Sequence, residues 1–452
     1  MYRKKPTATR PFQWFGRLSY SLDPSGSDPR PSLGCLDDGV TTDARSRAAI
    51  VADRTNPSGG LHRPGRASDA APLITDFVRD VAVPAAIRAG GMLVQLVVLA
   101  WLNGAGGPSL LDRLTKWDGL FYSEIASAGY PRRITIAPDG SLTEGMEFAF
   151  HPLFPGLAGA MHLLGVPARV AVVLVACIAG LAAAVVIHLL TKYLLGTRRA
   201  GYFAVALLGV LPASIALQMG YAESLYLALA GSAVLFALRG RWWLAAGFAF
   251  AAGLTRPTAL VLAVVVPLAA WRAARQARRQ GEPSPVRWPS VIGATIVAAA
   301  GAPVYWAWLW IRTGDPAAWF TVEEHGWASH FDFGVQTWNF VYDTLSGPDG
   351  FLAPVVCAIV LGYVVACVLL VLGRWPAPLT VVTLLSVAIA LLSTNYWHSK
   401  PRLLLAAFLL IVPAAGALTR LRDRTAVILL ATGTVASAWF GAYLLVVWPY
   451  AI

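Results

Sequence analysis

The sequence predicts an all-α, polytopic membrane protein. Of its 452 residues, 57% are hydrophobic and only 13% are charged, and the mean hydropathy is +0.59. Soluble globular chains are about 45–50% apolar and about 25% charged. Apolar stretches long enough to cross a bilayer recur along the chain. The composition therefore excludes an ordinary water-soluble enzyme.

The N-terminal segment, residues 1–72, is expected to be a disordered cytoplasmic tail. It is rich in Pro, Gly, Ser, Asp and Arg and shows no sustained periodicity. Such a composition cannot bury enough apolar area to offset the entropy of the chain. No signal-peptide pattern is visible, since no apolar core follows Arg3, Lys4 and Lys5. The arginines before the first span favour a cytoplasmic N-terminus.

Residues 73–452 are predicted to form one transmembrane domain with about eleven helices. The first apolar stretch runs from about Val81 to Leu102. The two stretches on either side of Arg256 are short for a hydrocarbon core of about 30 Å, which indicates a broken or re-entrant pair. The stretches after the first lie near 168–190, 201–219, 221–238, 242–256, 257–272, 289–311, 351–373, 377–394, 402–418 and 425–448.

The basic residues divide the predicted loops between two sides of the membrane. If the tail is cytoplasmic and each stretch crosses once, almost every basic cluster faces the cytoplasm, provided that the segment from Phe148 to Leu164 lies at the outer interface without crossing. The net charge of +12 is then a topology signal, and nucleic acid is not an expected partner. The clusters are Lys192, Arg198 and Arg199; Arg239 and Arg241; Arg272, Arg275, Arg278 and Arg279; Arg374; and Arg420, Arg422 and Arg424.

The opposite, extracytoplasmic side carries two long loops, 103–166 and 312–350, in which acidic and aromatic residues concentrate. In the first loop, Trp117 begins an apolar stripe at helical spacing that is typical of an interfacial helix. Asp118 and Tyr122, four residues apart, share another face of that helix. A carboxylate held there can take a proton from a hydroxyl group as a general base. The alternative is an anchor helix in which Asp118 only caps the helix or is solvated.

A second group of candidates lies in the aromatic and proline-rich run from Glu147 to Gly156. Aromatic surfaces suit the headgroup region and the faces of sugars or prenyl chains. Glu147 and His151 are candidates to bind a sugar hydroxyl or a phosphate. A structural role is the alternative for His151.

A third group consists of charges in or near the apolar stretches. Glu223 and Arg256 are costly at such positions unless they are functional or paired. Arg256, Lys400 and Arg402 place positive charge on the same predicted face, which suits a lipid-linked phosphate. The alternative is that Glu223 pairs with one of these cations as a structural strut.

Five motifs follow one another along the chain: Trp117-Asp118, the runs Ile125 to Tyr130 and Glu147 to Pro155, Tyr221-Ala222-Glu223-Ser224-Leu225, and Thr255-Arg256-Pro257. Taken together and in this order, they resemble the motifs of the PIG-V family of mannosyltransferases. The resemblance covers Asp112 to Leu260, and Ser399 to Ala407 more weakly. His151 stands where the family commonly has phenylalanine, and Arg256-Pro257 departs from the family's Arg-Ser-Asn form, which bears on the identity of the acceptor.

The resemblance implies a GT-C glycosyltransferase in the plasma membrane with a helical first external loop. It implies transfer of a sugar, most simply mannose, from a polyprenyl-phosphate donor to a hydroxyl of a glycolipid, glycan or glycoprotein acceptor outside the cytoplasm. The family's proposed base corresponds to Asp118. No metal or cofactor is expected, because the leaving group is already a lipid phosphate. The candidates for binding donor and acceptor are Trp117, Tyr122, Glu147, His151, Glu223, Arg256, Lys400 and Arg402.

The main alternative is a transporter or flippase of a lipid-linked or small polar substrate. A polytopic chain, a broken helix pair and buried charges fit that class equally well. However, the sequence shows no convincing internal repeat, and the Trp117-Asp118 loop is predicted outside the membrane rather than at its midplane. The sequence also contains no P-loop, so ATP-driven transport by this chain is unsupported. A scaffold without chemistry is disfavoured by the cost of Glu223 and Arg256 near the bilayer.

Overall fold

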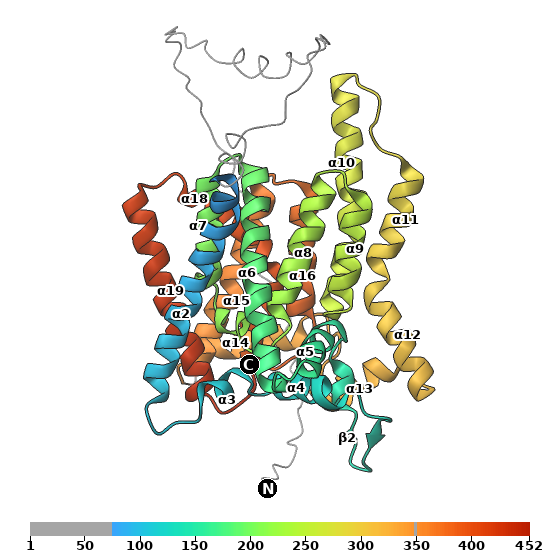
Figure 1. Ribbon diagram of the computed structural model, residues 1–452, viewed down its shortest axis with the longest axis vertical. Helices are drawn as coiled ribbons and strands as arrows, with labels where there is room; N and C mark the ends of the chain where they lie inside the picture. Colours follow the sequence, from blue (N-terminus) through green and yellow to red (C-terminus); the bar gives the residue numbers. More distant parts are fainter. Residues whose placement is uncertain (1–74, 348–349) are drawn as a thin grey trace, which may run out of the picture. The chain divides into compact units, whose positions relative to one another are not determined.

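The computed structural model describes residues 75–347 and 350–452, and the predicted tail, residues 1–72, lies outside the described residues. Long helices run side by side between two ends (Figure 1). Among the described residues, six helices are long and apolar enough to cross a membrane, or seven if one bent pair counts as a single span. The prediction of an all-α, polytopic membrane protein is confirmed, while the number of about eleven crossings stays a prediction.

Most spans and shorter apolar helices overlap the stretches predicted from hydropathy, and several extend beyond them. The long spans contain α2 (Val83–Asn103), which the short π-helix η1 (Val78–Ala82) precedes, α6 (Ala168–Leu195), η4 (Pro257–Val264) with α10 (Val265–Gln280), α15 (Leu352–Leu372) and α19 (Asp423–Val446). One further span is made of four consecutive elements, η5 (Trp397–Ser399), α17 (Lys400–Leu403), η6 (Leu404–Leu410) and α18 (Ile411–Leu418). The bent pair, at 49°, is α11 (Trp288–Ala299) with α12 (Gly301–Thr313). Shorter helices are α7 (Arg198–Val210, followed by η3, Ser214–Leu217), α8 (Glu223–Leu238), α9 (Trp242–Gly253) and α16 (Ala377–Leu392).

The predicted break near Arg256 is present, but the helix after it is longer than predicted. α9 ends at Gly253, and Arg256 has an extended backbone before η4 begins. η4 and α10 then continue for 24 residues, because the arginines after residue 271 are good helix formers and extend α10 beyond its apolar part. The helix ends at Gly281, whose φ of 71° is readily adopted only by glycine. The prediction of two short helices is therefore wrong for the second.

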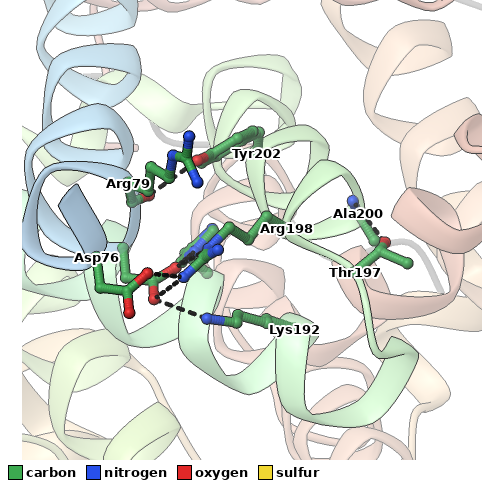
Figure 2. Close-up of polar contacts among 9 residues, drawn as sticks. Asp76, Arg79, Lys192, Thr197, Arg198, Ala200 and Tyr202 are labelled. Carbon is green, nitrogen blue, oxygen red and sulfur yellow. Dashed lines mark hydrogen bonds and ion pairs between the residues drawn. The ribbon is translucent and has the colours of Figure 1, made fainter. Parts of the chain in front are cut away.

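The start of the first span is tied to the next two helices by a cluster of charges (Figure 2). Lys192 Nζ lies 2.7 Å from Asp80 Oδ2, and Arg198 pairs with Asp80 at 2.9 Å and with Asp76 at 2.6 Å. The hydroxyl of Tyr202 donates to the carbonyl of Arg79 at 2.9 Å. These contacts hold the N-terminal end of α2 against the turn between α6 and α7.

Other basic loops lie at this same end of the helices, which we call the basic end. Arg199, at the start of α7, pairs with Asp423 at the start of α19 at 2.6 Å. The hydroxyl of Tyr193 donates to the carbonyl of Leu238 at 2.9 Å, which places the turn between α8 and α9 there. The loop between α10 and α11 lies at the same end in Figure 1. The common placement of basic loops agrees with the alternation used to predict the topology.

The other end of the helices, which we call the site end, gathers the two long loops (Figure 1). Helix α5 has 11 residues and therefore a length of about 16 Å, too short to cross a core of about 30 Å. Phe148 and Leu309 pack with Ala318 and Val322 in a buried cluster, so the second loop is held against the first. The elements at this end are α3 (Leu110–Leu114), α4 (Asp118–Ala128), the hairpin of β1 (Thr135–Ile136) and β2 (Leu142–Glu144), η2 (Met146–Ala149), α5 (Leu153–Leu163), α13 (Ala318–Trp327) and α14 (Val335–Ser346).

Candidate active site

Asp118 is the first residue of α4 and follows a tight turn. Trp117, the residue before it, has a φ of 56°, a left-handed conformation that costs a non-glycine residue about 1–3 kcal/mol. The indole packs against the main hydrophobic core, and Lys116 Nζ lies 4.1 Å from the centre of its ring. Trp117 thus holds the turn that presents Asp118.

A second turn, from Gly220 to Glu223, packs directly on the Asp118 turn. The Gly220 N–H donates to the carbonyl of Leu114 at 2.8 Å, and the Tyr221 hydroxyl donates to the carbonyl of Lys116 at 3.1 Å. A Cβ atom on Gly220 would lie 2.7 Å from a methyl group of Val172, so the close approach requires glycine. These contacts bring Glu223, the first residue of α8, beside the first residue of α4.

Four charged side chains form a chain of buried ion pairs between these turns. Arg402 donates to the carboxylate of Asp118, and Arg256 pairs with that of Glu223. Arg402 Nε also lies 3.7 Å from Glu223 Oε1. The Glu223 side chain is 4% exposed and the other three are 12–16% exposed. Two carboxylates balance two guanidinium groups, which is what burial of charge requires.

The predicted strut is therefore present, with Glu223 between both arginines. Arg402 also stacks over the ring of Tyr221, at 5.0 Å from its centre. The guanidinium is held by a carboxylate on each side and by an aromatic face. Within residues 75–347 and 350–452, no three His, Cys, Asp or Glu side chains are grouped to hold a metal ion.

A cavity of about 480 Å³ opens beside the ion pairs. Asp118, Tyr122, His151, Arg256 and Arg402 line it. Its volume falls within the range of about 300–1,000 Å³ that is usual for ligand pockets. Charged groups at one wall and apolar walls elsewhere suit an amphiphilic substrate. Those other walls include Phe150, Trp306, Trp319, Phe320, Trp327, Phe331, Tyr396, Leu260, Ile389 and Leu403, with Ser386, Ser393, Asn395 and Ser399.

Two of the predicted binding residues form neutral parts of this lining. Burial raises the pKa of Tyr122 well above its ordinary value, and its ring packs edge-on against Phe150 and Phe154. His151 Nδ1 lies 2.6 Å from the carbonyl of Gly253. Burial lowers the pKa of His151 to about 4, so the ring is neutral at pH 7 and Nδ1–H donates to that carbonyl. The other ring nitrogen, Nε2, is then a hydrogen-bond acceptor without a partner among the described residues.

Glu323, on α13, also lines the cavity and was not among the predicted site residues. Burial and the nearby charge of Asp118 raise the pKa of Glu323 to about 8, so this carboxyl is protonated at pH 7. The sequence carried one signal, a pair of glutamates beside the apolar residues Ala318 and Val322 in a long loop. Nothing in that pattern indicates which glutamate faces Asp118.

Four of the predicted residues, Trp117, Glu147, Glu223 and Lys400, lie outside the lining of the cavity. Lys400 is fully buried, and its ammonium group donates to the carbonyls of Ala390 at 3.1 Å and Ser393 at 3.3 Å. The last carbonyls of a helix have no partner within it, and Lys400 satisfies those at the end of α16. Glu147 lies half-buried on η2. Of the Lys400–Arg402 segment, only Arg402 supplies charge to the cavity.

The long apolar helices place the chain in the class of multi-pass membrane proteins. Residues 103–270 match the family profile described as Mannosyltransferase (PIG-V). The predicted resemblance to the PIG-V family, and the predicted class of enzyme, a glycosyltransferase, are confirmed over this segment. The segment contains Asp118, Glu223 and Arg256, whereas Glu323 and Arg402 lie beyond it.

Two solved structures of ArnT from Cupriavidus metallidurans are similar to the chain. The structure bound to undecaprenyl phosphate is 14% identical, with a TM-score of 0.45 over 83% of this chain and 76% of that chain. The structure in the apo state is 14% identical, with a TM-score of 0.42 over 84% of this chain and 76% of that chain. No curated protein matches the chain.

Proposed function

We propose that this protein transfers a sugar, most simply mannose, from a polyprenyl-phosphate donor to a hydroxyl group of a glycolipid, glycan or glycoprotein. The observation that carries the proposal is the position of Asp118, a carboxylate that lines an amphiphilic cavity and is paired with Arg402. The match to mannosyltransferases supports the sugar, and the apolar and aromatic walls suit a prenyl chain and a sugar ring.

Asp118 is the general base of the proposed reaction. It accepts the proton of the acceptor hydroxyl while that oxygen forms a bond to the anomeric carbon. The bond from the anomeric carbon to the phosphate oxygen breaks, and its electron pair leaves on the polyprenyl phosphate. Arg402 and Arg256 stabilise the negative charge that develops there. A single displacement of this kind inverts the anomeric configuration.

The ion pair between Arg402 and Asp118 couples donor binding to the base. Without a donor, Arg402 is shared between Asp118 and Glu223. A phosphate in the cavity competes for the same guanidinium and adds negative charge beside Asp118. The donor therefore draws Arg402 away from Asp118 and leaves this carboxylate free to accept the proton of the acceptor hydroxyl only when the donor is present.

The activity is tested with membranes that contain the full chain and radiolabelled polyprenyl-phosphate mannose. A new mannosylated product that is absent with the Asp118→Asn chain supports the transferase. Labelled lipid that changes leaflet without forming a product supports the alternative, a flippase. The two outcomes distinguish a transferase from a flippase, because the same labelled lipid either gives up its mannose to a product or moves between leaflets unchanged.

Glu323 is expected to give the transfer reaction an alkaline limb. Its pKa, raised by burial to about 8, means that the carboxyl is neutral below pH 8 and ionises above it, next to Asp118. The ionised carboxylate repels the donor phosphate in the same cavity, so donor binding weakens and the rate should fall as the pH rises through 8. Glu323→Gln keeps a neutral side chain at every pH, and its rate should vary less between pH 7 and 9. The neighbouring variant Glu324→Gln is the control and should keep the parent profile; a Glu323→Gln profile that still falls at pH 8 would contradict the assignment.

We also propose that the basic end faces the cytoplasm and that the site end lies outside the plasma membrane. The placement of basic loops at one end supports this orientation. A cysteine that replaces Gly140, in the hairpin at the site end, should react with an impermeant thiol reagent added to intact cells. A cysteine that replaces Gln280, at the end of α10, should react only after the cells are opened. The unsubstituted chain gives the background of its four cysteines, and the reverse pattern would overturn the orientation.

A further inference from the structure

A second cavity, of about 770 Å³, lies at the basic end, at the opposite end of the helices from Asp118. It is bordered by the ends of α6, α15 and α18 and by the start of α7. Most of its lining is apolar, including Leu195, Leu369, Leu410 and Pro413. The charged cluster of Figure 2 adjoins this cavity through Thr197 and Ala200, which line it. The proposed transfer reaction makes no use of this cavity.

The cavity borders an exposed apolar face of α15. Leu369, on α15, is 62% exposed and lines the cavity from a membrane-spanning helix. Gly416, on α18, leaves space inside, since a Cβ atom there would only touch Leu195 at 3.4 Å and Trp375 at 3.9 Å. A larger side chain at Gly416 would extend into the cavity. Since α15 is long and apolar enough to span a membrane, its exposed face is expected to meet lipid, and membrane lipids are the molecules that would reach the cavity from this side.

The mouth of the cavity is positively charged. Arg199 is fixed by donating to the carbonyls of Thr419 and Leu421, both at 2.9 Å, and its charge is shared with Asp423. Arg420 also lines the cavity, is exposed, and has no side-chain partner among the described residues. Two guanidinium groups and one carboxylate leave a net positive charge at the rim.

Trp375 adds an aromatic side chain to the same rim. Tryptophan is enriched at the level of the headgroups, where an apolar ring and a polar N–H are both accommodated. The cavity therefore offers an apolar lining to a hydrocarbon chain and an unpaired cation, Arg420, to a headgroup. This arrangement is complementary to an amphiphile with an anionic head. A second copy of this chain is a poor occupant, because two cationic rims would repel one another.

We infer that this cavity binds an anionic glycerophospholipid, with an acyl chain between α6, α15 and α18 and the headgroup phosphate at Arg420 and Arg199. Basic pockets between membrane helices select anionic headgroups in this way, with about 1 kcal/mol for each basic residue near the surface. The site is separate from the proposed transferase site, and its occupancy does not depend on that reaction.

The inference is tested by native mass spectrometry of the purified full chain titrated with phosphatidylglycerol or phosphatidylcholine. We expect phosphatidylglycerol to bind more tightly, and Arg420→Gln to weaken its binding about fivefold. Arg424→Gln is the matched control, because Arg424 lies on the first turn of α19 and does not line the cavity. Gly416→Leu fills the cavity and should remove the binding of phosphatidylglycerol. The thermal unfolding midpoint of each variant shows that the chain is folded.

Two results would overturn the inference. Equal binding of phosphatidylglycerol and phosphatidylcholine by the parent chain would show that the headgroup is not recognised. An equal loss with Arg420→Gln and Arg424→Gln would show diffuse attraction to a basic surface. Because the readout is bound lipid, either failure leaves the transferase proposal untouched, and a failed transfer assay leaves the lipid site untouched.

Discussion

Replacement of Asp118 by asparagine is expected to lower the rate of sugar transfer by about 10²–10⁴-fold, the usual contribution of a positioned general base. Asparagine has nearly the same shape but cannot accept the proton of the acceptor hydroxyl. The loss should appear in kcat, because the proton moves in the transition state and the substrates still fit the cavity. The measurement is the initial rate of transfer from labelled polyprenyl-phosphate mannose at saturating donor.

The matched control is Glu124→Gln, another change from acid to amide on α4. Glu124 is exposed and does not line the cavity, so the rate should stay within a factor of two to three of the parent, about the scatter of surface substitutions. A folded Asp118→Asn protein with the full rate would remove Asp118 from the role of base. The anchor-helix alternative would then be preferred.

Replacement of Arg402 by glutamine is expected to damage both activity and stability. The lost guanidinium no longer stabilises the leaving phosphate, which should lower kcat by about 10²–10³-fold, as for removal of one preorganised donor. The buried carboxylates of Asp118 and Glu223 also lose their shared partner. Breaking a buried ion pair at one partner costs about 3–5 kcal/mol. Transfer rates and the midpoint of chemical unfolding measure the two effects separately.

A second substitution separates catalysis from stability. In the double variant Arg402→Gln and Glu223→Gln, one carboxylate, Asp118, and one guanidinium, Arg256, remain in the cluster, so much of the stability should return. The transfer rate should stay low, because Arg402 is still missing from the phosphate site. If the rate returned together with the stability, Arg402 would have only a structural role.

Arg133 provides the control for a surface ion pair at the same end of the molecule. It pairs with Glu144 at 2.9 Å, and the two side chains are 78% and 38% exposed. Exposed pairs contribute about 0–1 kcal/mol because water screens them. Arg133→Gln should therefore leave both the rate and the unfolding midpoint close to those of the parent.

Several of the charged residues at the candidate active site could be found from the sequence, because burying an ionisable residue in or near an apolar stretch costs free energy. Glu223 and Arg256 stand out for that reason, and Asp118 stands out through its interfacial helix. The sequence left open whether Glu223 is a structural partner of a cation or the arginines bind a phosphate. In the structure Glu223 pairs with both Arg256 and Arg402, and both arginines also line the cavity, so the two roles are compatible. Their catalytic and binding roles remain proposals.

Other residues could not be assigned without the fold. Lys400 and Arg402 are two residues apart and equally basic, but Lys400 completes the end of α16 while Arg402 reaches Asp118. Glu323 resembles its neighbour Glu324 in sequence, and only the packing of α13 on η2 brings it to the cavity. In both cases the choice is made by partners that are distant in the chain.

The sequence alone was sufficient for the class of structure, because burying apolar side chains in a bilayer depends on composition and on the length of each stretch. It was also sufficient to place the basic loops together, because the positions of the spans determine which loops share an end. The tertiary structure decided which charges meet and which carboxyl is protonated. Those properties depend on distances of a few ångströms and on local burial, and electrostatic energies change steeply with both.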